Sequence, residues 1–417
     1  MPIEPDLLSA SGKPLFFEVA NADALGVAAP PIRPGRGEAV RVLVRSLSAM
    51  QKEALVASSR TGAVWRLASD EGAYLDGHDA APCPLSFFTV GMISSYANEI
   101  LALASQRGIG LRNLTLVQDN TYTMKGSALA GTMTAGARDV DLEAIADTDA
   151  SADALRALVH DAVVASPLNG LMRGAKESLF TLSHNGRAIP LAKARPVGRP
   201  AEPDPGDRID RAGPGQGGRS ALVRRGGPSP KHAHTTTFAG GSLAEHQDRL
   251  LHVHAICRLR DDGVKEVEQH LYNPHGSIFR FLCHEAPENG GRGLAPDAAS
   301  YLSAGIGFCF MTQLGRYAKI VKKALRSYRI VQDTHFSLGG ASGGTGEPGA
   351  ADPVETHVHL ESAETDDFAR ACLDMAEQTC FLHAFCRTPL KARVKVTRAE
   401  KTAAPGTRSA TSPSAST

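Results

Sequence analysis

The stretch SAGIGFCFMTQ (residues 303–313) places a single cysteine, Cys309, inside an apolar run that is typical of a buried helix. The stretch TVGMISSYANE (89–99) lies 214 positions earlier and carries Ser95 where the later stretch carries Cys309. Two similar helices at a fixed spacing indicate a repeated unit. The exchange of a thiol for a hydroxyl raises the question whether Cys309 is a core residue or a working thiol.

Further segments align at the same spacing of 214. LVQDNTY (116–122) aligns with IVQDTHF (330–336) and shares Val-Gln-Asp in register, and ASPLNG (165–170) aligns with TCFLHA (379–384). Several anchors in one register, over about 90 residues without a net gap, predict an internal duplication.

Each half has the same order of expected elements. Strand-like runs come first, followed by an apolar helix of roughly 20 residues led by proline. Strands around Val-Gln-Asp and a second helix follow, the latter opening with Ser, Thr or Asp as N-cap. A last strand closes each half, ESLFTLSH (177–184) or KARVKV (391–396). This order predicts an α+β fold built from two tandem modules, with strands packed around two central helices per module.

Composition suggests where these modules begin and end. A chain of 417 residues is too long for one ordinary core, and Pro-, Gly- and charge-rich stretches interrupt it. We expect an N-terminal extension (1–35), a first module (36–186), a flexible linker (187–235), a second module (236–396) and a disordered tail (397–417).

The overall charge and the cysteine count narrow the classes of function. The 45 Lys and Arg residues nearly balance 44 Asp and Glu, so a net charge of +1 gives no electrostatic case for nucleic acid or an anionic membrane as partner. The longest apolar region, residues 84–104, is interrupted by Ser94, Ser95, Asn98 and Glu99, which predicts a buried helix rather than a membrane span. We expect no secretory signal, and the odd number of seven cysteines fits a reducing cytoplasm.

A second cysteine strengthens the case for a working thiol. Cys309 and Cys380 are expected on the first and second helices of the second half, 71 residues apart, and Ser95 and Ser166 have the same separation in the first half. Free cysteine is a common small core residue that serine replaces at tolerant sites. The loss of both thiols on an otherwise retained framework instead favours chemistry in one half and a scaffold role in the other.

A thiol pair on facing helices suits peroxide reduction. One thiolate attacks the O–O bond and becomes a sulfenic acid, a second thiol condenses with it to a disulfide, and an external dithiol resets the pair. The attacking thiol needs a nearby cation to lower its pKa. His383, three residues after Cys380, is expected to supply a positive charge or a hydrogen bond, and its first-half counterpart is Asn169.

This pattern resembles the OsmC/organic hydroperoxide resistance family over residues 36–186 and 236–396. The resemblance implies small α+β subunits in an intertwined dimer, here fused into one chain as an intramolecular pseudo-dimer. It also implies reduction of organic hydroperoxides, with Cys309 as attacking thiol and Cys380 as resolving thiol. The second half would hold the intact site and the first half a degenerate one, marked by Ser95, Ser166 and Asn169.

The chain departs from the family pattern near the first cysteine. The family places Pro and Glu eleven and ten residues before it, where this chain has Ala298 and Ala299. Asp297 is the nearest substitute for the Glu, and Arg258 and Arg260 are the second-half candidates for the family's activating Arg.

Two other classes of function stay open. One is different cysteine-dependent sulfur chemistry on the same fold, and the other is a non-catalytic binding, assembly or Cys/His metal-binding protein. For the leading hypothesis we expect no cofactor and no metal. The expected partners are a small-molecule substrate (an organic hydroperoxide or a sulfur compound) and an external dithiol reductant, with further homo-oligomerisation of the fused pair left open.

Overall fold

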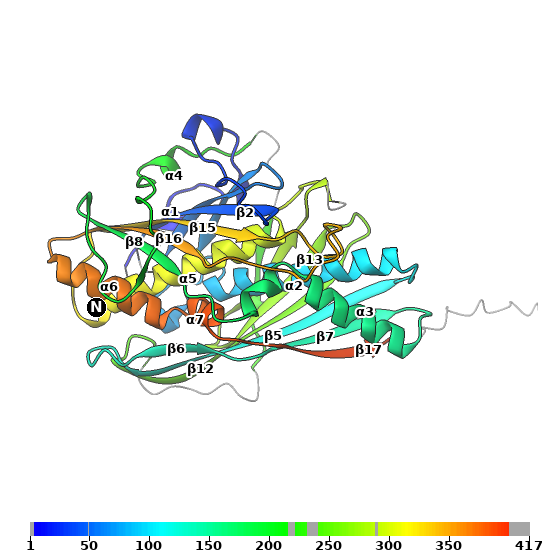
Figure 1. The fold of residues 1–417 in the computed structure, drawn as a ribbon. Helices are drawn as coiled ribbons and strands as arrows, with labels where there is room; N and C mark the ends of the chain where they lie inside the picture. Colours follow the sequence, from blue (N-terminus) through cyan, green and yellow to red (C-terminus); the bar gives the residue numbers. More distant parts are fainter. Residues whose placement is uncertain (1–3, 49, 216–221, 232–240, 288–290, 400–417) are drawn as a thin grey trace, which may run out of the picture.

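The computed structural model describes residues 4–48, 50–215, 222–231, 241–287 and 291–399. Two sheets enclose two long helices, which confirms the predicted α+β class (Figure 1). The first sheet has the order β1 (Phe17–Glu18), β4 (Val64–Ser69), β3 (Lys52–Ser58), β2 (Glu38–Ser46), β15 (Ser327–Phe336), β16 (Glu355–Glu361), β8 (Leu179–His184) and β10 (Arg195–Pro196), with β9 (Arg187–Ala188) beside β8. The second has the order β11 (Val223–Pro228), β14 (Ser277–Cys283), β13 (Lys265–Asn273), β12 (His246–Leu259), β5 (Asn113–Ser127), β7 (Val140–Asp147) and β17 (Ala392–Arg398), with β6 (Thr134–Ala137) beside β5.

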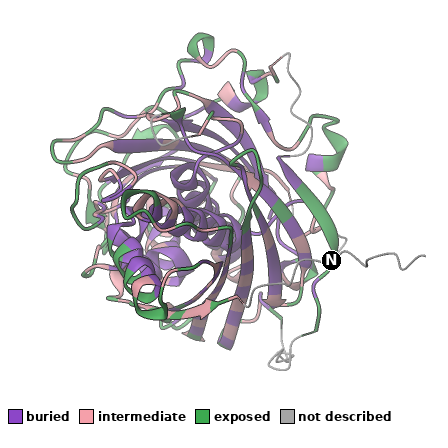
Figure 2. Ribbon diagram, turned by 90° about the vertical axis from the view of Figure 1, so that its right-hand side faces the viewer, coloured by how far each residue is buried: buried purple, intermediate pink, exposed green. Residues whose placement is uncertain are grey.

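The helices α2 (Pro84–Gln106) and α5 (Ala298–Ile320) lie between the sheets, α2 against the second sheet and α5 against the first. Figure 2 shows these helices buried inside the surrounding strands. Length and composition alone would let α2 cross a membrane, but most of it is buried in the protein. The remaining helical elements are shorter and include α1 (Leu7–Ala10), η1 (Asp23–Leu25), η2 (Ala73–Leu75), α3 (Ala152–Ala165), η3 (Leu168–Met172), α4 (Arg208–Arg211), α6 (Asp366–Thr379) and α7 (Phe381–Arg387).

Local sequence explains where the main helices begin. Pro84 occupies the first turn of α2, where its missing N–H costs no hydrogen bond. Asp297, Ser151 and Thr365 cap α5, α3 and α6, because each side chain accepts a hydrogen bond from the backbone N–H three residues later. The bounds of α2 and α5 differ by 214 at both ends, and so do those of α3 and α6.

A pair of glycines allows α2 and α5 to approach each other closely. A Cβ atom at Gly91 would lie 2.4 Å from the carbonyl oxygen of Ala298, and one at Gly305 would lie 2.6 Å from the backbone nitrogen of Phe88. These neighbours are backbone atoms and cannot rotate away. The two glycines are also 214 residues apart, so each helix presents the same position to its partner.

Each sheet mixes strands from both halves of the sequence. In the first sheet β2 pairs with β15, for example Val42 with Gln332, and in the second β12 pairs with β5, for example Ile256 with Val117. The last strand of each half then pairs in parallel with a strand of the other half, β8 with β16 and β17 with β7. One hydrophobic core therefore spans both halves. The predicted domain boundaries stay a prediction, because strands from the two halves alternate within each sheet.

The segment expected as a flexible linker (187–235) forms β9, β10, α4 and β11 in its described parts. These parts join the rest of the protein through strand pairing, ion pairs and apolar side chains such as Ile189, Ile209 and Val223, which are buried in the hydrophobic core. The flexibility of the segment stays a prediction. The N-terminal extension contributes α1 and β1. In the predicted tail, Thr397 and Arg398 belong to β17, and residues 400–417 lie outside the described residues.

Candidate thiol site

The two cysteines singled out by the sequence meet in the core. Cys309 lies on α5 with 2% of its surface exposed, and Cys380 is fully buried. Their side chains are close enough to interact. The corresponding first-half residues, Ser95 and Ser166, form an Oγ–Oγ hydrogen bond of 2.7 Å. Both halves therefore bring the same two positions together, with sulfur in one half and oxygen in the other.

Cys380 stands between two helices and not within one, which corrects the predicted placement. The chain turns at this residue (φ −74°, ψ 118°), so Cys380 ends α6 and caps α7. Its Sγ accepts a hydrogen bond from the backbone N–H of His383 at 3.5 Å, and the backbone N–H of Leu382 donates to the sulfur of Cys309. The first turn of α7 thus directs one N–H at each sulfur.

The surroundings favour the protonated form of Cys309. Burial raises the pKa of the Cys309 thiol well above its ordinary value, and the contact with Cys380 raises it further. The Leu382 N–H acts in the opposite direction because it stabilises a thiolate, but it does not outweigh burial. In this state the thiol is held neutral.

His383 does not supply the positive charge that the sequence suggested. Burial lowers the pKa of His383 to about 3, so the ring is neutral near pH 7. The ring lies 5.1 Å from the ring of Phe310 and 5.5 Å from that of Phe180, and among the described residues neither ring nitrogen has a hydrogen-bond partner. In the first half the equivalent positions form a hydrogen bond of 2.8 Å from the Tyr96 hydroxyl to Asn169 Oδ1.

A pocket opens onto Cys309 but not onto Cys380. It is narrow, with a volume of about 20 Å³, and is lined mainly by apolar side chains, together with a few polar ones. The apolar lining includes Leu75, Leu85, Leu251 and Phe381. A molecule in this pocket reaches Cys309 first, with Cys380 behind it.

The polar groups beside this pocket come from both halves of the chain. Glu71, on the first-half side, accepts hydrogen bonds from the hydroxyls of Tyr74 (2.7 Å) and Thr312 (2.9 Å). Lys52 on β3 is buried, donates to the Met50 carbonyl, and is close enough to Cys309 for the two groups to interact electrostatically. Burial lowers the pKa of Lys52. The first half therefore contributes both a carboxylate and an amine to the surroundings of the second-half thiol.

The other predicted supporting residues are placed away from Cys309. Asp297 caps α5, accepting from Ser300 N at 2.7 Å and Ser58 Oγ at 2.6 Å. Twelve residues of helix separate it from Cys309, which corresponds to about 18 Å. Arg258 and Arg260 are exposed on and just after β12, and neither lines the pocket. The structure does not bring these three residues to the thiol.

Sequence reasoning missed four charged residues near the site, namely Lys52, Glu71, Arg249 and Arg316. One signal was available, because Arg316 follows Cys309 by seven residues and so lies on the same face of α5. The other three come from segments distant in sequence, and only the strand exchange brings them close.

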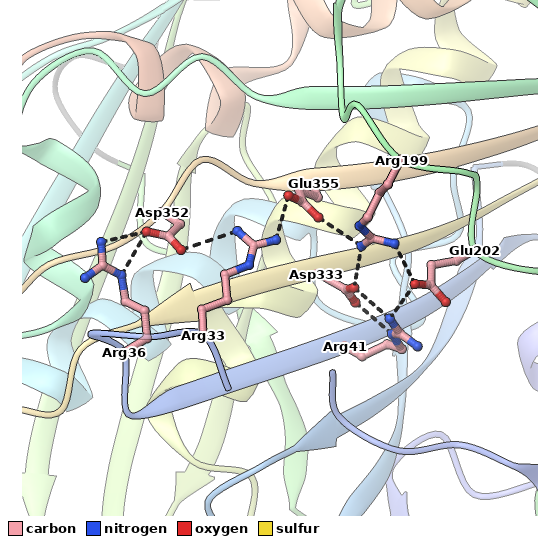
Figure 3. A network of polar contacts seen from close by, with 8 residues as sticks. All are labelled: Arg33, Arg36, Arg41, Arg199, Glu202, Asp333, Asp352 and Glu355. Atoms are coloured by element: carbon pink, nitrogen blue, oxygen red, sulfur yellow. Dashed lines mark hydrogen bonds and ion pairs between the residues drawn. The ribbon is translucent and has the colours of Figure 1, made fainter. Parts of the chain in front are cut away.

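One group of carboxylates and a histidine bears on the metal-binding alternative. Among the described residues, Glu202, Asp333 and His357 form a group whose ligand atoms lie within 4.8 Å of one another, and no cysteine belongs to it. Arg41 contacts Asp333 at 2.7 Å and Glu202 at 3.1 Å. Figure 3 shows these carboxylates inside a network of guanidinium groups that joins β2, β15 and the segment after β10. The network members are Arg33, Arg36, Arg41, Arg199, Glu202, Asp333, Asp352 and Glu355.

Comparison with known proteins gave one similar structure. No protein-family model matches the chain, and no curated protein matches it. The chain is similar to a solved OsmC-like hydroperoxide resistance protein from Jannaschia sp. CCS1, with 21% sequence identity and a TM-score of 0.25. The alignment covers 37% of this chain and 99% of that one.

Proposed function

We propose that the protein is a thiol-dependent redox enzyme that reduces organic hydroperoxides, with Cys309 as attacking thiol and Cys380 as resolving thiol. The observation that carries the proposal is the order in which the pocket, Cys309 and Cys380 are arranged. The pocket reaches Cys309, and the Cys309 side chain contacts Cys380, which does not line the pocket.

The proposed chemistry has three steps. The Cys309 thiolate attacks the outer oxygen of the hydroperoxide, giving a sulfenic acid and, after proton transfer, an alcohol. Cys380 attacks the sulfenic sulfur, so a disulfide forms and water leaves. An external dithiol then reduces the disulfide by thiol exchange and is itself oxidised to a disulfide.

Cys309 must lose its proton before it attacks. Two groups already in place favour the thiolate, the Leu382 N–H and the Lys52 ammonium. Burial opposes both, so we expect slow reaction at neutral pH and a rate that rises with pH as more thiolate forms.

We also propose that the chain is two OsmC-like modules fused into one pseudo-dimer. The helix bounds repeated at 214 residues, the paired Gly91 and Gly305, and the exchange of strands between halves support this arrangement. In this view the first half is a scaffold, because Ser95 and Ser166 hold the thiol positions with hydroxyls.

The test is a thiol count by intact-mass alkylation under denaturing conditions, before and after one equivalent of cumene hydroperoxide. Wild type should lose two alkylatable thiols. Cys380→Ser should form a sulfenic acid that a dimedone probe traps on Cys309. Cys386→Ser is the matched control, because Cys386 is also buried and lies on α7, and it should still lose two thiols.

Persistence of the peroxide with all seven wild-type thiols alkylatable would exclude the peroxidase function. Equal loss of thiols in wild type and in a Cys309→Ser variant would place the reaction on other cysteines.

A further inference from the structure

Two buried arginines next to the thiol pocket have no ion-pair partner in the part of the chain that the structure describes. Arg316 on α5 is 1% exposed and Arg249 on β12 is 6% exposed. Within the described part of the chain, neither forms an ion pair with a carboxylate. The undescribed stretch that precedes Ser242, residues 232–240, contains no Asp or Glu in its sequence.

The hydrogen bonds of these two guanidinium groups are also incomplete. Arg316 donates from Nε to the Ser242 carbonyl at 2.7 Å, and Arg249 donates from Nη1 to the Ser242 hydroxyl. Their other contacts include the thioether sulfurs of Met133 (3.3 Å) and Met124 (3.9 Å), which are weak acceptors. Among the described residues, Arg316 Nη2 and Arg249 Nε are buried without a partner. Buried cations are normally paired, so this arrangement calls for an anion.

Both arginines are adjacent to the thiol pocket. Arg249 lines the pocket, and its guanidinium carbon lies 5.9 Å from the centre of the Phe381 ring, which also lines it. Arg316 lies one helical turn beyond Gln313, whose Oε1 accepts from Arg316 Nη1 at 3.2 Å. Cys309 and Gln313 both line the pocket, so one face of α5 leads from the thiol to Arg316.

The nearby acids do not neutralise this pair. Glu71 lines the pocket and attracts Arg249, but it also interacts with the buried ammonium of Lys52. Asp70 likewise interacts with Lys52. For Arg316 the neighbouring charge that acts on it is the cation Arg249, and together with burial it lowers the pKa of Arg316 to about 9, which still leaves the group charged near pH 7. Among the described residues, the acids that act on these arginines are thus shared with a third buried cation, Lys52.

The first half carries the opposite charge pattern at the matching helix positions. Gln313 and Arg316 correspond to Glu99 and Ala102. The Glu99 carboxylate is already bound by the backbone N–H groups of Ala341 (2.8 Å) and Ser342 (3.1 Å). The unpaired arginines therefore lie in the half of the structure that contains the two thiols.

We propose that Arg249 and Arg316 bind the anionic oxygen group, such as a carboxylate, of the ligand that enters the Cys309 pocket. The apolar lining takes the rest of the molecule, so the ligand has an apolar body and one anionic end. This inference rests on the proposed function only for the reaction that the bound ligand undergoes. The anion-binding site itself does not depend on that function.

The test measures binding of benzoate and of its neutral analogue benzamide by isothermal titration calorimetry. The proteins are wild type, Arg249→Gln, Arg316→Gln and, as matched control, Arg258→Gln, which removes an exposed arginine from the same strand as Arg249. We expect wild type and the control to bind benzoate at least tenfold more tightly than benzamide. Each of the two buried-arginine variants should lose that preference.

Arg316→Lys keeps the positive charge without the paired N–H donors, and it should retain part of the preference. If Arg316→Gln does not fold, Arg316→Lys and Arg249→Gln are the variants that test the inference. Equal binding of benzoate and benzamide by wild type, or an unchanged preference in the folded arginine variants, would overturn the inference.

The two proposals fail separately. Arginine-dependent benzoate binding by a protein that leaves cumene hydroperoxide unconsumed would refute the peroxidase function and support the anion site. Peroxide consumption without preferential benzoate binding would do the reverse.

Discussion

The close approach of α2 and α5 gives a quantitative prediction, because α5 contains two glycines in different surroundings. At Gly305 a Cβ would lie 2.6 Å from Phe88 N and 2.9 Å from Pro84 O, both backbone atoms. At Gly307 the nearest atom would be a methyl group of Val44 at 3.1 Å, followed by side-chain atoms at 3.6 Å. Gly305→Ala and Gly307→Ala are therefore a matched pair.

The two substitutions share one favourable contribution. Alanine is better than glycine in a helix interior by about 1 kcal/mol. At Gly305 the backbone of α2 must move away, and overpacking of this kind costs about 1–3 kcal/mol, here near the upper end. We expect Gly305→Ala to be about 1–2 kcal/mol less stable than wild type, and about 2–3 kcal/mol less stable than Gly307→Ala.

The assay is urea denaturation followed by circular dichroism. The two variants are compared if their m-values, the slopes of unfolding free energy against urea concentration, agree. Gly91→Ala should behave like Gly305→Ala, since its Cβ would also meet backbone atoms. Stabilities of Gly305→Ala and Gly307→Ala that agree within about 0.5 kcal/mol would refute the close helix crossing, because that difference is the size of ordinary surface effects.

Two further predictions concern the thiol site. Ser95→Cys combined with Ser166→Cys should give a protein that loses four thiols to the oxidant diamide but only two to hydroperoxide. The reason is that the first half has the pair geometry but carries Ala102 where the second half carries Arg316. Loss of four thiols to hydroperoxide would contradict this. Burial lowers the pKa of His383 from about 6.5 in the unfolded chain to about 3 in the folded one, so the unfolded state binds more protons and stability falls as pH drops through this window, by about 1 kcal/mol per unit between roughly pH 6 and 4. His383→Leu should reduce that slope in denaturation experiments at several pH values, and an unchanged slope would show that His383 is not a buried neutral group.

Sequence patterns predicted the two central helices better than the segments that pack around them. The α2 and α5 helices could be read from apolar runs, and the start of α2 from Pro84, because these signals are local. The segment containing β10 and β11 was predicted as flexible because its order depends on partners elsewhere in the chain.

At the candidate site, too, some residues were predicted correctly from the sequence and others were not. The sequence identified Cys309 and Cys380 through the constant spacing between halves, and the structure places them in contact. It misjudged His383, because helical spacing gives no information about burial, and burial decides the charge of a histidine.

The sequence by itself determined the elements, their repetition and the thiol pair, since each depends on residues close in the chain or on a fixed offset. Only the tertiary structure decided what surrounds that pair. Lys52 and Glu71 come from the first half and Arg249 from β12, and the exchange of strands places them beside the second-half thiol. Such contacts join residues about 60 to 260 positions apart, and chain connectivity over such distances leaves no periodic trace in the sequence.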